Sequence, residues 1–281
     1  MTIPTRGVHS APDPGVAPVP LREVQSWLTE SELRQIYTAA YWNDVEEEKK
    51  KEWWIEDGDY EKCRVHLEHS GLLHEYRQAA SFISGMERAE LRVADLAAGI
   101  GWTSALISRI GSVAEVHAVE ISRHRLERLF PHAVAMFGGR AEKIHRHLGS
   151  FYELRLPPDS MDVVYLSHAF HHADRPLELL RECDRVLKPG GRIIVSGEHE
   201  IGLRLLARRF LGTLLRERRL VTDFRRLFPP HPLLGDHYYR YADYCQLFEP
   251  LGYKLQHCVA ANGNGLYVAD KLGASQGSVP S

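Results

Sequence analysis

From residue 91 onward, the chain alternates short apolar runs with helical patterns, and this alternation constrains the fold more than any other feature. The apolar runs LRVADLAA, AEVHAVEIS, MDVVYLSHA and GRIIVSGE are typical of strands. The segments between them repeat apolar residues every three or four positions. Such alternation predicts a parallel sheet with helical crossovers. Because these crossovers are right-handed, the strands end along one edge, where such sheets bind ligands.

The C-terminal part of the chain departs from this alternation. A short helix pattern, YADYCQLFEPLGY, precedes two strand patterns, YKLQHCV and LYVADKL. An Asn262-Gly263 pair lies between the two strand patterns, and an Asn-Gly dipeptide is a strong hairpin signal. The sheet is therefore expected to end in an antiparallel pair.

The N-terminal part predicts helices. The first twenty residues hold five prolines and lack the apolar core of a signal peptide, so we expect a disordered leader. From Leu21 to about Ser84 the spacing is helical, with Ser31 as the cap of the second helix. The apolar residues that follow this spacing are Trp27, Leu28, Leu33, Ile36 and Tyr37.

A charged run and an aromatic pair lie within this helical region. The run EEEKKKE, residues 46–52, places opposite charges one turn apart, which is typical of a solvated helix face. Trp53 and Trp54 come next. Their large apolar area favours the core over a position against a ligand.

Composition excludes several classes of protein. A hydrophobic content of 44% and a charged content of 26% are those of a globular protein. The net charge of −2 gives no general attraction to nucleic acid, so no nucleic-acid partner is expected. The four cysteines form no CxxC pair, which favours reduced thiols in a cytoplasmic protein over a zinc ribbon or a disulfide framework. The sequence has no run of about 18 apolar residues, the length that a membrane span requires, so no span is expected.

A turn of small residues follows the first strand of the alternating region. The strand ends at Asp95, and a helix starts near Thr103. Small residues let backbone amides approach a ligand, and the start of a helix favours compact polar groups. A purely structural turn is the alternative. The small residues are Ala97, Ala98, Gly99 and Gly101.

Glu120 closes the second strand, 21 positions after Gly99. A carboxylate at this point can accept hydrogen bonds from both ribose hydroxyls, as in dinucleotide-binding folds. An exposed helix-capping glutamate is the alternative, but with the small-residue turn we favour ribose binding. A nicotinamide oxidoreductase is a weaker rival, because the turn lacks the last glycine of GxGxxG. The YxxxK match from Tyr267 to Lys271 falls on a strand pattern rather than on a helix.

Three motifs, taken together and in order, resemble a known family. They are DLAAGIG, the acidic Glu120, and the stretch from LPPDSMDVVYLSHAFHH through LKPGG. The chain is similar to the class I S-adenosylmethionine (SAM)-dependent methyltransferases. Within that class it looks closest to the group of the ubiquinone and menaquinone methyltransferases and many natural-product O-, N- and C-methyltransferases. The resemblance covers roughly residues 86–200 and 240–272.

This resemblance implies an α/β, Rossmann-like fold with a seven-stranded, mostly parallel sheet and an antiparallel C-terminal hairpin. It also suggests how the chain is divided. We expect a leader over residues 1–20, an N-terminal helical lid over 21–85, a SAM-binding core over 86–200, a basic helical insertion after the fifth strand over 201–240, the C-terminal helix and hairpin over 241–272, and a tail over 273–281.

The resemblance also implies that SAM is the cofactor. Asp95 and the small residues Ala97, Ala98, Gly99 and Gly101 would wrap its methionine part. Glu120 would bind the ribose hydroxyls, with Ile121 against the adenine. Ala97 replaces the usual first glycine of the turn, which should be tolerated if its φ is negative.

Two further turns carry expected cofactor contacts. Ser150 stands where family members often have an aspartate that holds the adenine, and Phe151 would compensate by packing or through its backbone amide. Ser167 and His168, which end the fourth strand, should lie beside the methionine and the methyl donor.

Histidines gather at the expected ligand edge. His171 and His172 follow the fourth strand, and His199 follows the fifth between two glutamates. Histidine suits a general base near neutral pH, so these three are the candidate catalytic residues. The alternative is that family members carry a histidine there without using it as a base. We expect no metal site from these groups.

An arginine-rich segment follows the fifth strand. Residues 201–228 carry eight arginines against one Glu and one Asp. As a lid, this segment would attract an acceptor that is anionic, bound to a carrier protein, or lipophilic and held at a membrane surface. A solvated amphipathic helix is the alternative. Its helical stripe is Leu203, Leu206, Phe210 and Leu214, and the residues that could line an acceptor pocket after it are His231, His237, Tyr238 and Tyr239.

These features predict SAM-dependent methyl transfer to an oxygen, nitrogen or carbon atom of a small molecule, in specialised metabolism. Two alternatives stay open. One is a SAM-binding protein that catalyses a non-methylating reaction such as a cyclisation, since fold does not fix function. The other is a nucleic-acid methyltransferase, which the absence of an NPPY-type motif disfavours. A homodimer is one option for the oligomeric state.

Overall fold

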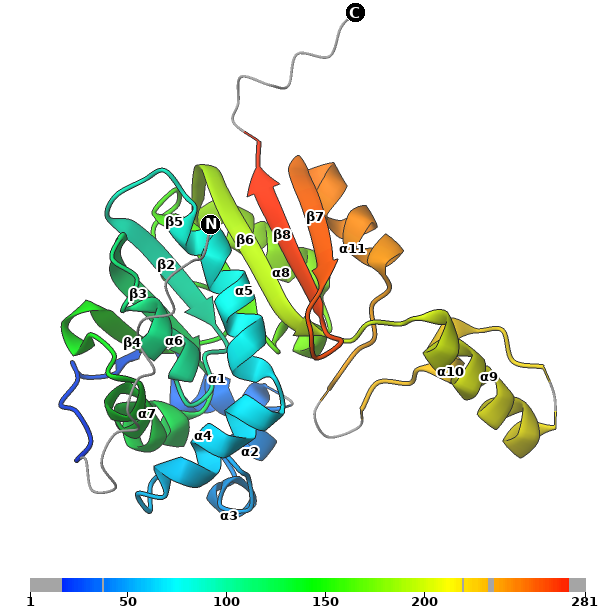
Figure 1. The fold of residues 1–281 in the computed structure, drawn as a ribbon, viewed down its shortest axis with the longest axis horizontal. Coiled ribbons are helices and arrows are strands. Elements are labelled where there is room, and N and C mark those ends of the chain that lie inside the picture. The colour runs from blue at the N-terminus through cyan, green and yellow to red at the C-terminus, as the bar shows by residue number, and fades with distance from the viewer. Residues whose placement is uncertain (1–16, 37, 219, 232–234, 273–281) are drawn as a thin grey trace, which may run out of the picture.

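The computed structural model describes residues 17–36, 38–218, 220–231 and 235–272 (Figure 1). The leader up to residue 16, the tail from residue 273 and Tyr37 lie outside these ranges. One eight-stranded sheet has the order β1-β4-β3-β2-β5-β6-β8-β7. Among its neighbouring strands, only the pairs that involve β8 are antiparallel. Seven strands form the predicted sheet: β2 (Leu91–Leu96), β3 (Val113–Glu120), β4 (Ile144–Leu148), β5 (Met161–Ser167), β6 (Leu187–Glu198), β7 (Tyr253–Val259) and β8 (Gly265–Lys271).

The eighth strand corrects the prediction that residues 21–28 are helical. β1 (Gln25–Ser26) pairs in parallel with β4. The backbone N–H of Trp27 continues this pairing by donating to the carbonyl of Leu148 at 2.8 Å. The indole is buried and stacks on the His147 ring, with centroids 4.2 Å apart. The extended conformation of residues 25–27 thus gives the backbone hydrogen-bond partners in β4 and buries the Trp27 indole.

The first helix in the structure corresponds to the second predicted one, and its cap lies two residues before the predicted cap, Ser31. α1 (Glu30–Gln35) is capped by Thr29, and Ser31 lies inside the helix. Thr29 and Glu32 form a capping box, in which each side chain binds the other residue's backbone N–H. This reciprocal pair satisfies two helix-end donors, which a cap at Ser31 would not do.

Helices cover both faces of the sheet (Figure 1). One face packs against α5 (Leu72–Ser84), α6 (Trp102–Ile107) and α7 (Phe130–Phe137), the last continuing from the π-helix η1 (Arg125–Leu129). The other face packs against α8 (Pro176–Val186) and α11 (Tyr241–Phe248). Three single-turn 3₁₀ helices complete this part: η2 (Ala141–Lys143), η3 (Phe170–His172) and η4 (Glu249–Leu251).

The short N-terminal helices gather at the edge where the parallel strands end (Figure 1). They are α1, α2 (Ala39–Trp42), α3 (Val45–Glu48) and α4 (Tyr60–His69). A separate apolar cluster joins them to the domain, in which Ile55, Cys63 and Leu67 pack with Leu129 and Ala133. The N-terminal helices therefore cover the ligand edge of the sheet.

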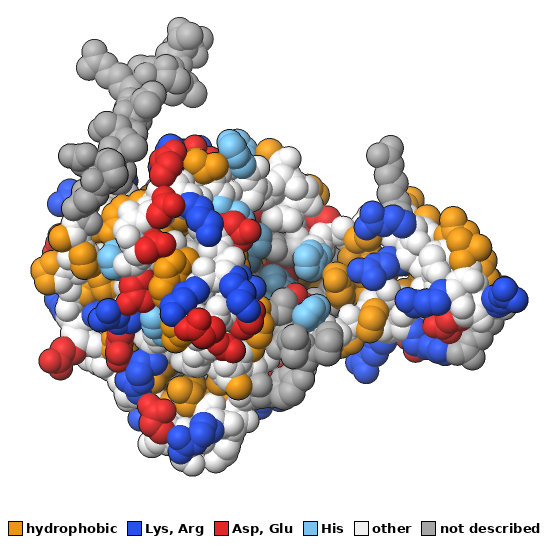
Figure 2. All heavy atoms as spheres, turned by 90° about the horizontal axis from the view of Figure 1, so that it is seen from below, with side chains coloured by type: hydrophobic (Ala, Val, Ile, Leu, Met, Phe, Trp, Pro, Cys, Tyr) orange, Lys and Arg blue, Asp and Glu red, His pale blue; other side chains and the backbone are white. Residues whose placement is uncertain are grey.

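The insertion forms an arm. α9 (Leu203–Glu217) and α10 (Phe224–Leu227) project sideways from the sheet (Figure 1). Leu206 and Phe210 pack in the arm's own apolar cluster, whereas Leu203 of the predicted stripe is 84% exposed. Basic side chains cover much of the arm, and histidines gather where it meets the body (Figure 2).

The predicted C-terminal hairpin is confirmed: β7 and β8 pair in antiparallel fashion around Asn262-Gly263. The turn predicted at LKPGG differs from the structure. The LKPGG segment begins β6 instead of preceding it, and the register between β5 and β6 shifts there. Within the described ranges, no helix is long and apolar enough to cross a membrane.

Candidate functional site

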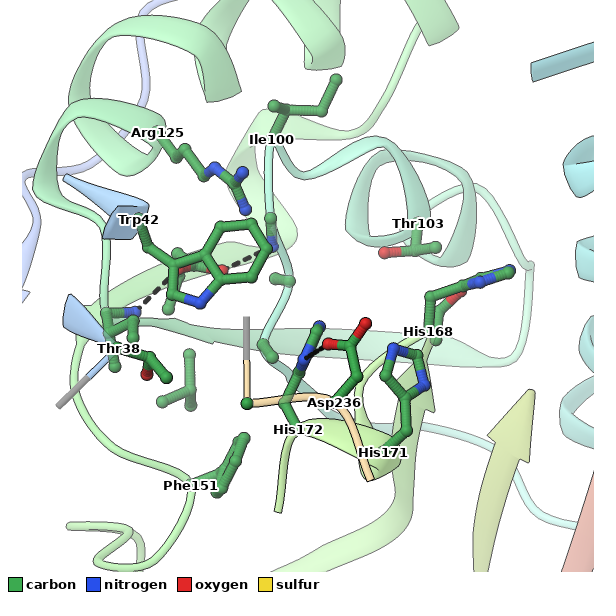
Figure 3. Close-up of a pocket in the computed structure, with 18 of the residues that line it drawn as sticks. Thr38, Trp42, Ile100, Thr103, Arg125, Phe151, His168, His171, His172 and Asp236 are labelled. Atoms are coloured by element: carbon green, nitrogen blue, oxygen red, sulfur yellow. Dashed lines mark hydrogen bonds and ion pairs between the residues drawn. The ribbon is translucent and has the colours of Figure 1, made fainter. Parts of the chain in front are cut away.

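A cavity of about 1190 Å³ opens at the carboxyl ends of the parallel strands (Figure 3). The turns after β2, β3, β4 and β5 form one side of it, and the N-terminal helices with residues 230–231 and 235–237 form the other. Asp95, Gly101 and His199 do not line the cavity. Eleven other predicted site residues do: Ala97, Ala98, Gly99, Glu120, Ile121, Ser150, Phe151, Ser167, His168, His171 and His172.

The small-residue turn is held in a left-handed conformation. Gly99 and Gly101 have φ of +57° and +85°. A Cβ on Gly101 would lie 2.3 Å from the Phe130 ring, so only glycine fits between the turn and α7. Ala97 has φ of +51°, which corrects the expectation of a negative φ. An L-residue in this region carries a strain of about 1–2 kcal/mol.

Asp95 stabilises the start of the following helix. Its Oδ2 accepts hydrogen bonds from the hydroxyls of Thr103 and Ser104 at 2.7 and 2.5 Å. Burial raises the pKa of Asp95 to about 6, although both hydroxyls favour its ionised form. The side chain thus organises the turn from behind.

Glu120 joins the turn after β2 to the turn after β3. One carboxylate oxygen accepts from the backbone N–H of Gly99 at 2.8 Å, and the other accepts from those of Ile121 and Ser122 at 2.9 Å. The residue is 4% exposed and lines the cavity. The two predicted elements, turn and carboxylate, therefore meet.

His168 connects the end of β5 to a residue that the sequence patterns did not reveal. It has φ of +52°, and its Nε2 lies 3.5 Å from Oε2 of the buried Glu75. The same oxygen accepts from the side-chain amides of Asn262 and Asn264 at 2.8 and 3.0 Å. Despite burial, these hydrogen-bonding groups lower the pKa of Glu75. The C-terminal hairpin thus helps to fix the cavity wall.

His171 is backed by a buried carboxylate. Its Nδ1 lies 3.2 Å from Glu198, which also accepts from the hydroxyl of Tyr244 at 3.0 Å. Burial opposes the charged imidazole, but the charge of Glu198 outweighs it and raises the pKa of His171. Burial likewise disfavours an ionised Glu198, yet His171 lowers the pKa of this carboxyl below its usual range. The two groups form a buried, polarised pair at the cavity.

His172 meets Asp236, which comes from the segment that returns from the arm (Figure 3). The Nδ1 and Oδ1 atoms lie 2.9 Å apart. The indole of Trp42 packs edge-on against His172, with centroids 5.3 Å apart. His199 is exposed and stacks on Tyr238 instead, with its centroid 5.4 Å from that of His171.

The arm itself lies away from the cavity. None of the described residues of α9 and α10 lines it. Of the residues expected to line an acceptor pocket, His231 and His237 do so, whereas Tyr238 and Tyr239 do not. Among its described residues, the insertion therefore contributes to the cavity wall through residues 230–231 and 235–237, which we call the return segment.

Buried polar contacts hold the N-terminal helices over the cavity. Glu48 is 1% exposed and binds Arg125 with Nη2–Oε1 and Nε–Oε2 distances of 2.6 and 3.1 Å. The Arg125 guanidinium also lies 4.6 Å from the centroid of Trp42 (Figure 3). Asn43 donates to the carbonyl of Ile121 and accepts from the backbone N–H of Arg123. Glu48 is thus an exception within the charged run, where Lys49 and Lys50 pair with Glu46 and Glu47 at the surface.

Comparison with known proteins identifies the domain. Residues 94–195 match the family model of a methyltransferase domain. The chain is 32% identical over 105 residues to a malonyl-[acyl-carrier protein] O-methyltransferase of Methylococcus capsulatus, covering 37% of this chain and 36% of that protein. It is 31% identical over 172 residues to a mitochondrial ubiquinone biosynthesis O-methyltransferase of Schizosaccharomyces pombe, covering 59% and 57%. The chain thus spans between about a third and somewhat over half of the length of these relatives.

A solved structure agrees with this match. A SAM-dependent methyltransferase from Mesorhizobium loti is similar in fold, with a TM-score of 0.51 and 20% identity, over 70% of this chain and 97% of that one. Residues 94–195 therefore form a methyltransferase domain. The predicted Rossmann-like α/β fold is confirmed, and the cofactor of the methyltransferase domain is SAM.

The cavity of the methyltransferase domain fits this cofactor. Glu120, at the end of the second core strand, presents a carboxylate beside the left-handed turn at Gly99. Ligand pockets commonly measure about 300–1,000 Å³, so this larger cavity has room for a cofactor and an acceptor together.

Proposed function

We propose that this protein transfers a methyl group from SAM to an oxygen, nitrogen or carbon atom of a small molecule. The observation that carries this proposal is the single cavity that joins the Glu120 turn to the histidines after β5. SAM, when bound, supplies a methyl group on a positively charged sulfur. The protein's task is then mainly alignment, which can contribute about 7–11 kcal/mol to a reaction between two held partners.

The sheet side of the cavity would hold the cofactor. Glu120 would accept hydrogen bonds from the ribose hydroxyls. The turn at residues 97–101 would surround the methionine part, with Asp95 and Gly101 supporting the turn from behind. Ile121, Ser150 and Phe151 would contact the adenine, and Ser167 and His168 would flank the methionine and the methyl donor.

The opposite side would hold the acceptor. His171 and His172 lie where they can take a proton from an acceptor hydroxyl or ammonium, a role that typically adds about 10²–10⁴-fold. Glu198 would orient His171 and stabilise its charged form. His199 lies outside the cavity lining, so a role as base would require it to move.

The comparisons suggest the kind of acceptor. One relative is named for malonyl-[acyl-carrier protein] and another for ubiquinone biosynthesis. We propose a small acceptor, free or bound to a carrier, in specialised metabolism in the cytoplasm. The basic arm would attract an anionic carrier or an anionic acceptor.

Turnover tests the proposal. The full chain is incubated with SAM and a panel of phenolic, quinol, amine and carrier-bound carboxylate acceptors, and S-adenosylhomocysteine is measured with each. Acceptor-dependent product is expected with at least one class. Tight SAM binding without product from any class would contradict methyl transfer and favour a non-methylating reaction.

A further inference from the structure

Three potential metal ligands meet on the acceptor side of the cavity. His171 and His172 come from η3, and Asp236 comes from the return segment, 64 residues further along the chain. One ligand atom from each lies within 4.8 Å of the other two. Figure 3 shows the Asp236 carboxylate between the two imidazole rings. Two imidazoles and one carboxylate therefore converge on one point of the cavity wall.

Two atoms of this cluster pair only with each other. His172 Nδ1 and Asp236 Oδ1 form an ion pair at 2.9 Å and are shielded from solvent, and neither makes a hydrogen bond with any other residue that the structure describes. Buried polar groups usually have hydrogen-bond partners of their own. A cation bound between the carboxylate and the imidazoles would satisfy both atoms.

The third ligand already has the support that metal-binding histidines usually have. Nδ1 of His171 faces Glu198, and Tyr244 donates to the same carboxylate. The backbone carbonyl of His171 also accepts from the N–H of His237 at 2.6 Å. A carboxylate on one ring nitrogen fixes the imidazole and makes the other nitrogen a better ligand. Nε2 of His171 is the atom this arrangement prepares.

We propose that His171, His172 and Asp236 bind a divalent transition-metal ion such as Zn²⁺ or Co²⁺. Imidazole nitrogens suit these ions, and two histidines with one carboxylate are a recurrent ligand set that leaves a position for substrate. That position faces the cavity, where it would take an oxygen atom of the acceptor. The consequence for catalysis rests on the proposed function: the metal ion would lower the pKa of an acceptor hydroxyl, and the histidines would act as ligands rather than as bases. Binding of the ion does not depend on that function.

A second histidine cluster provides a contrast. Glu115, His117 and His145 also bring their ligand atoms within 4.8 Å of one another. There, however, Arg92 lies 2.7 Å from the Glu115 carboxylate and Arg22 lies 3.1 Å from the His145 ring. Guanidinium groups already occupy these ligands and would repel a cation. This cluster therefore supplies a matched control.

Cobalt binding tests the inference directly. The full chain, freed of metal by chelation, is titrated with Co²⁺ while visible absorption and bound metal are measured. We expect one equivalent bound with ligand-field absorption, lost in D236N and H172N and retained in H145N. E198Q should bind about 10- to 100-fold more weakly, because it alters only the group behind His171. SAM binding by calorimetry shows that each variant is folded.

The outcomes separate this inference from the proposed function. A wild-type chain that binds no stoichiometric Co²⁺, or a D236N variant that binds it as well as wild type, would overturn the metal site and leave an ion pair only. Methyl transfer by a metal-free protein would then still support the proposed function. Cobalt binding with the expected variant pattern, but without turnover of any acceptor, would uphold the site and contradict methyl transfer.

Discussion

The two sides of the cavity are built in different ways. The sheet side consists of the turns that follow β2, β3, β4 and β5. The lid side consists of side chains between Gln35 and Leu72, with Tyr37 outside the described residues, and of residues 230–231 and 235–237 of the return segment. On the sheet side, Glu120 binds backbone amides of two neighbouring turns. On the lid side, the contacts are between side chains from distant parts of the chain, such as Glu48 with Arg125.

This difference separates what the fold supplies from what the particular chain adds. Parallel strands bring their carboxyl ends together in any sheet of this kind, so the sheet side follows from the topology. The lid side depends on a few buried polar pairs that must find one another over long distances. We therefore expect substitutions in the two sides to affect different properties.

The largest effect is expected on the lid side. E48A would leave the buried Arg125 guanidinium without its carboxylate, which typically costs about 3–5 kcal/mol. Hydrogen exchange should accelerate accordingly in α2 and α3, while amides of β2 and β3 keep their protection. E47A is the matched control, because Glu47 pairs with Lys50 at the surface, where such pairs contribute about 0–1 kcal/mol. Equal effects of E48A and E47A would show that the lid is held in another way.

A smaller effect is expected from adding one methyl group to the sheet side. G101A would place a Cβ 2.3 Å from Phe130 at a φ of +85°. Overpacking and backbone strain together should lower the free energy of unfolding by about 2–4 kcal/mol. G138A isolates the backbone part, since Gly138 also has positive φ but nothing lies within 4 Å of its Cβ position. If denaturant unfolding gave the same loss for both, the contact with Phe130 would not matter.

The smallest expected effect is a gain in stability. A97G would relieve the left-handed strain at Ala97, partly offset by the greater freedom of glycine in the unfolded chain. We expect the free energy of unfolding to rise by about 0.5–1 kcal/mol. A98G should instead lower it, because Ala98 is not among the residues with positive φ. A loss of stability in A97G, measured by thermal unfolding, would contradict the strain.

The sequence predicted the sheet side well because its residues lie in short motifs at strand ends. Ala97 and His168 directly follow a strand, Glu120 ends one, and Ser150 lies two residues after another. All four line the cavity. Spacing alone did not distinguish residues that face the cavity from those that support it. Gly101, for example, makes room for Phe130.

The lid side could not be predicted from local patterns. Glu48 is hidden in a run of surface charges, and its partner is 77 residues away. Glu75 and Asp236 are single acidic residues whose histidine partners lie in a different part of the chain. No local pattern distinguishes such residues from solvated ones, because only the tertiary fold makes their contacts.

Two strands escaped direct pattern analysis for a related reason. β4 has the sequence IHRHL and follows no simple alternation of apolar and polar residues. Its Arg146 is buried because backbone carbonyls of Leu126 and Arg22 accept its N–H groups. β1 has two residues and exists only as an addition to β4. Strand propensity cannot predict such strands, because contacts with distant parts of the chain stabilise them.

Calorimetry with SAM on wild type and E120A tests the central claim, that the left-handed turn and Glu120 together bind the nucleoside of SAM. E115A is the control, because Glu115 lies on the same strand but does not line the cavity. We expect wild type and E115A to bind SAM alike and E120A to bind it more weakly by about 1.5–3 kcal/mol, the contribution of a hydrogen-bonded charged group. Unchanged affinity in a folded E120A, or a wild-type protein that binds NADH but not SAM, would contradict the account.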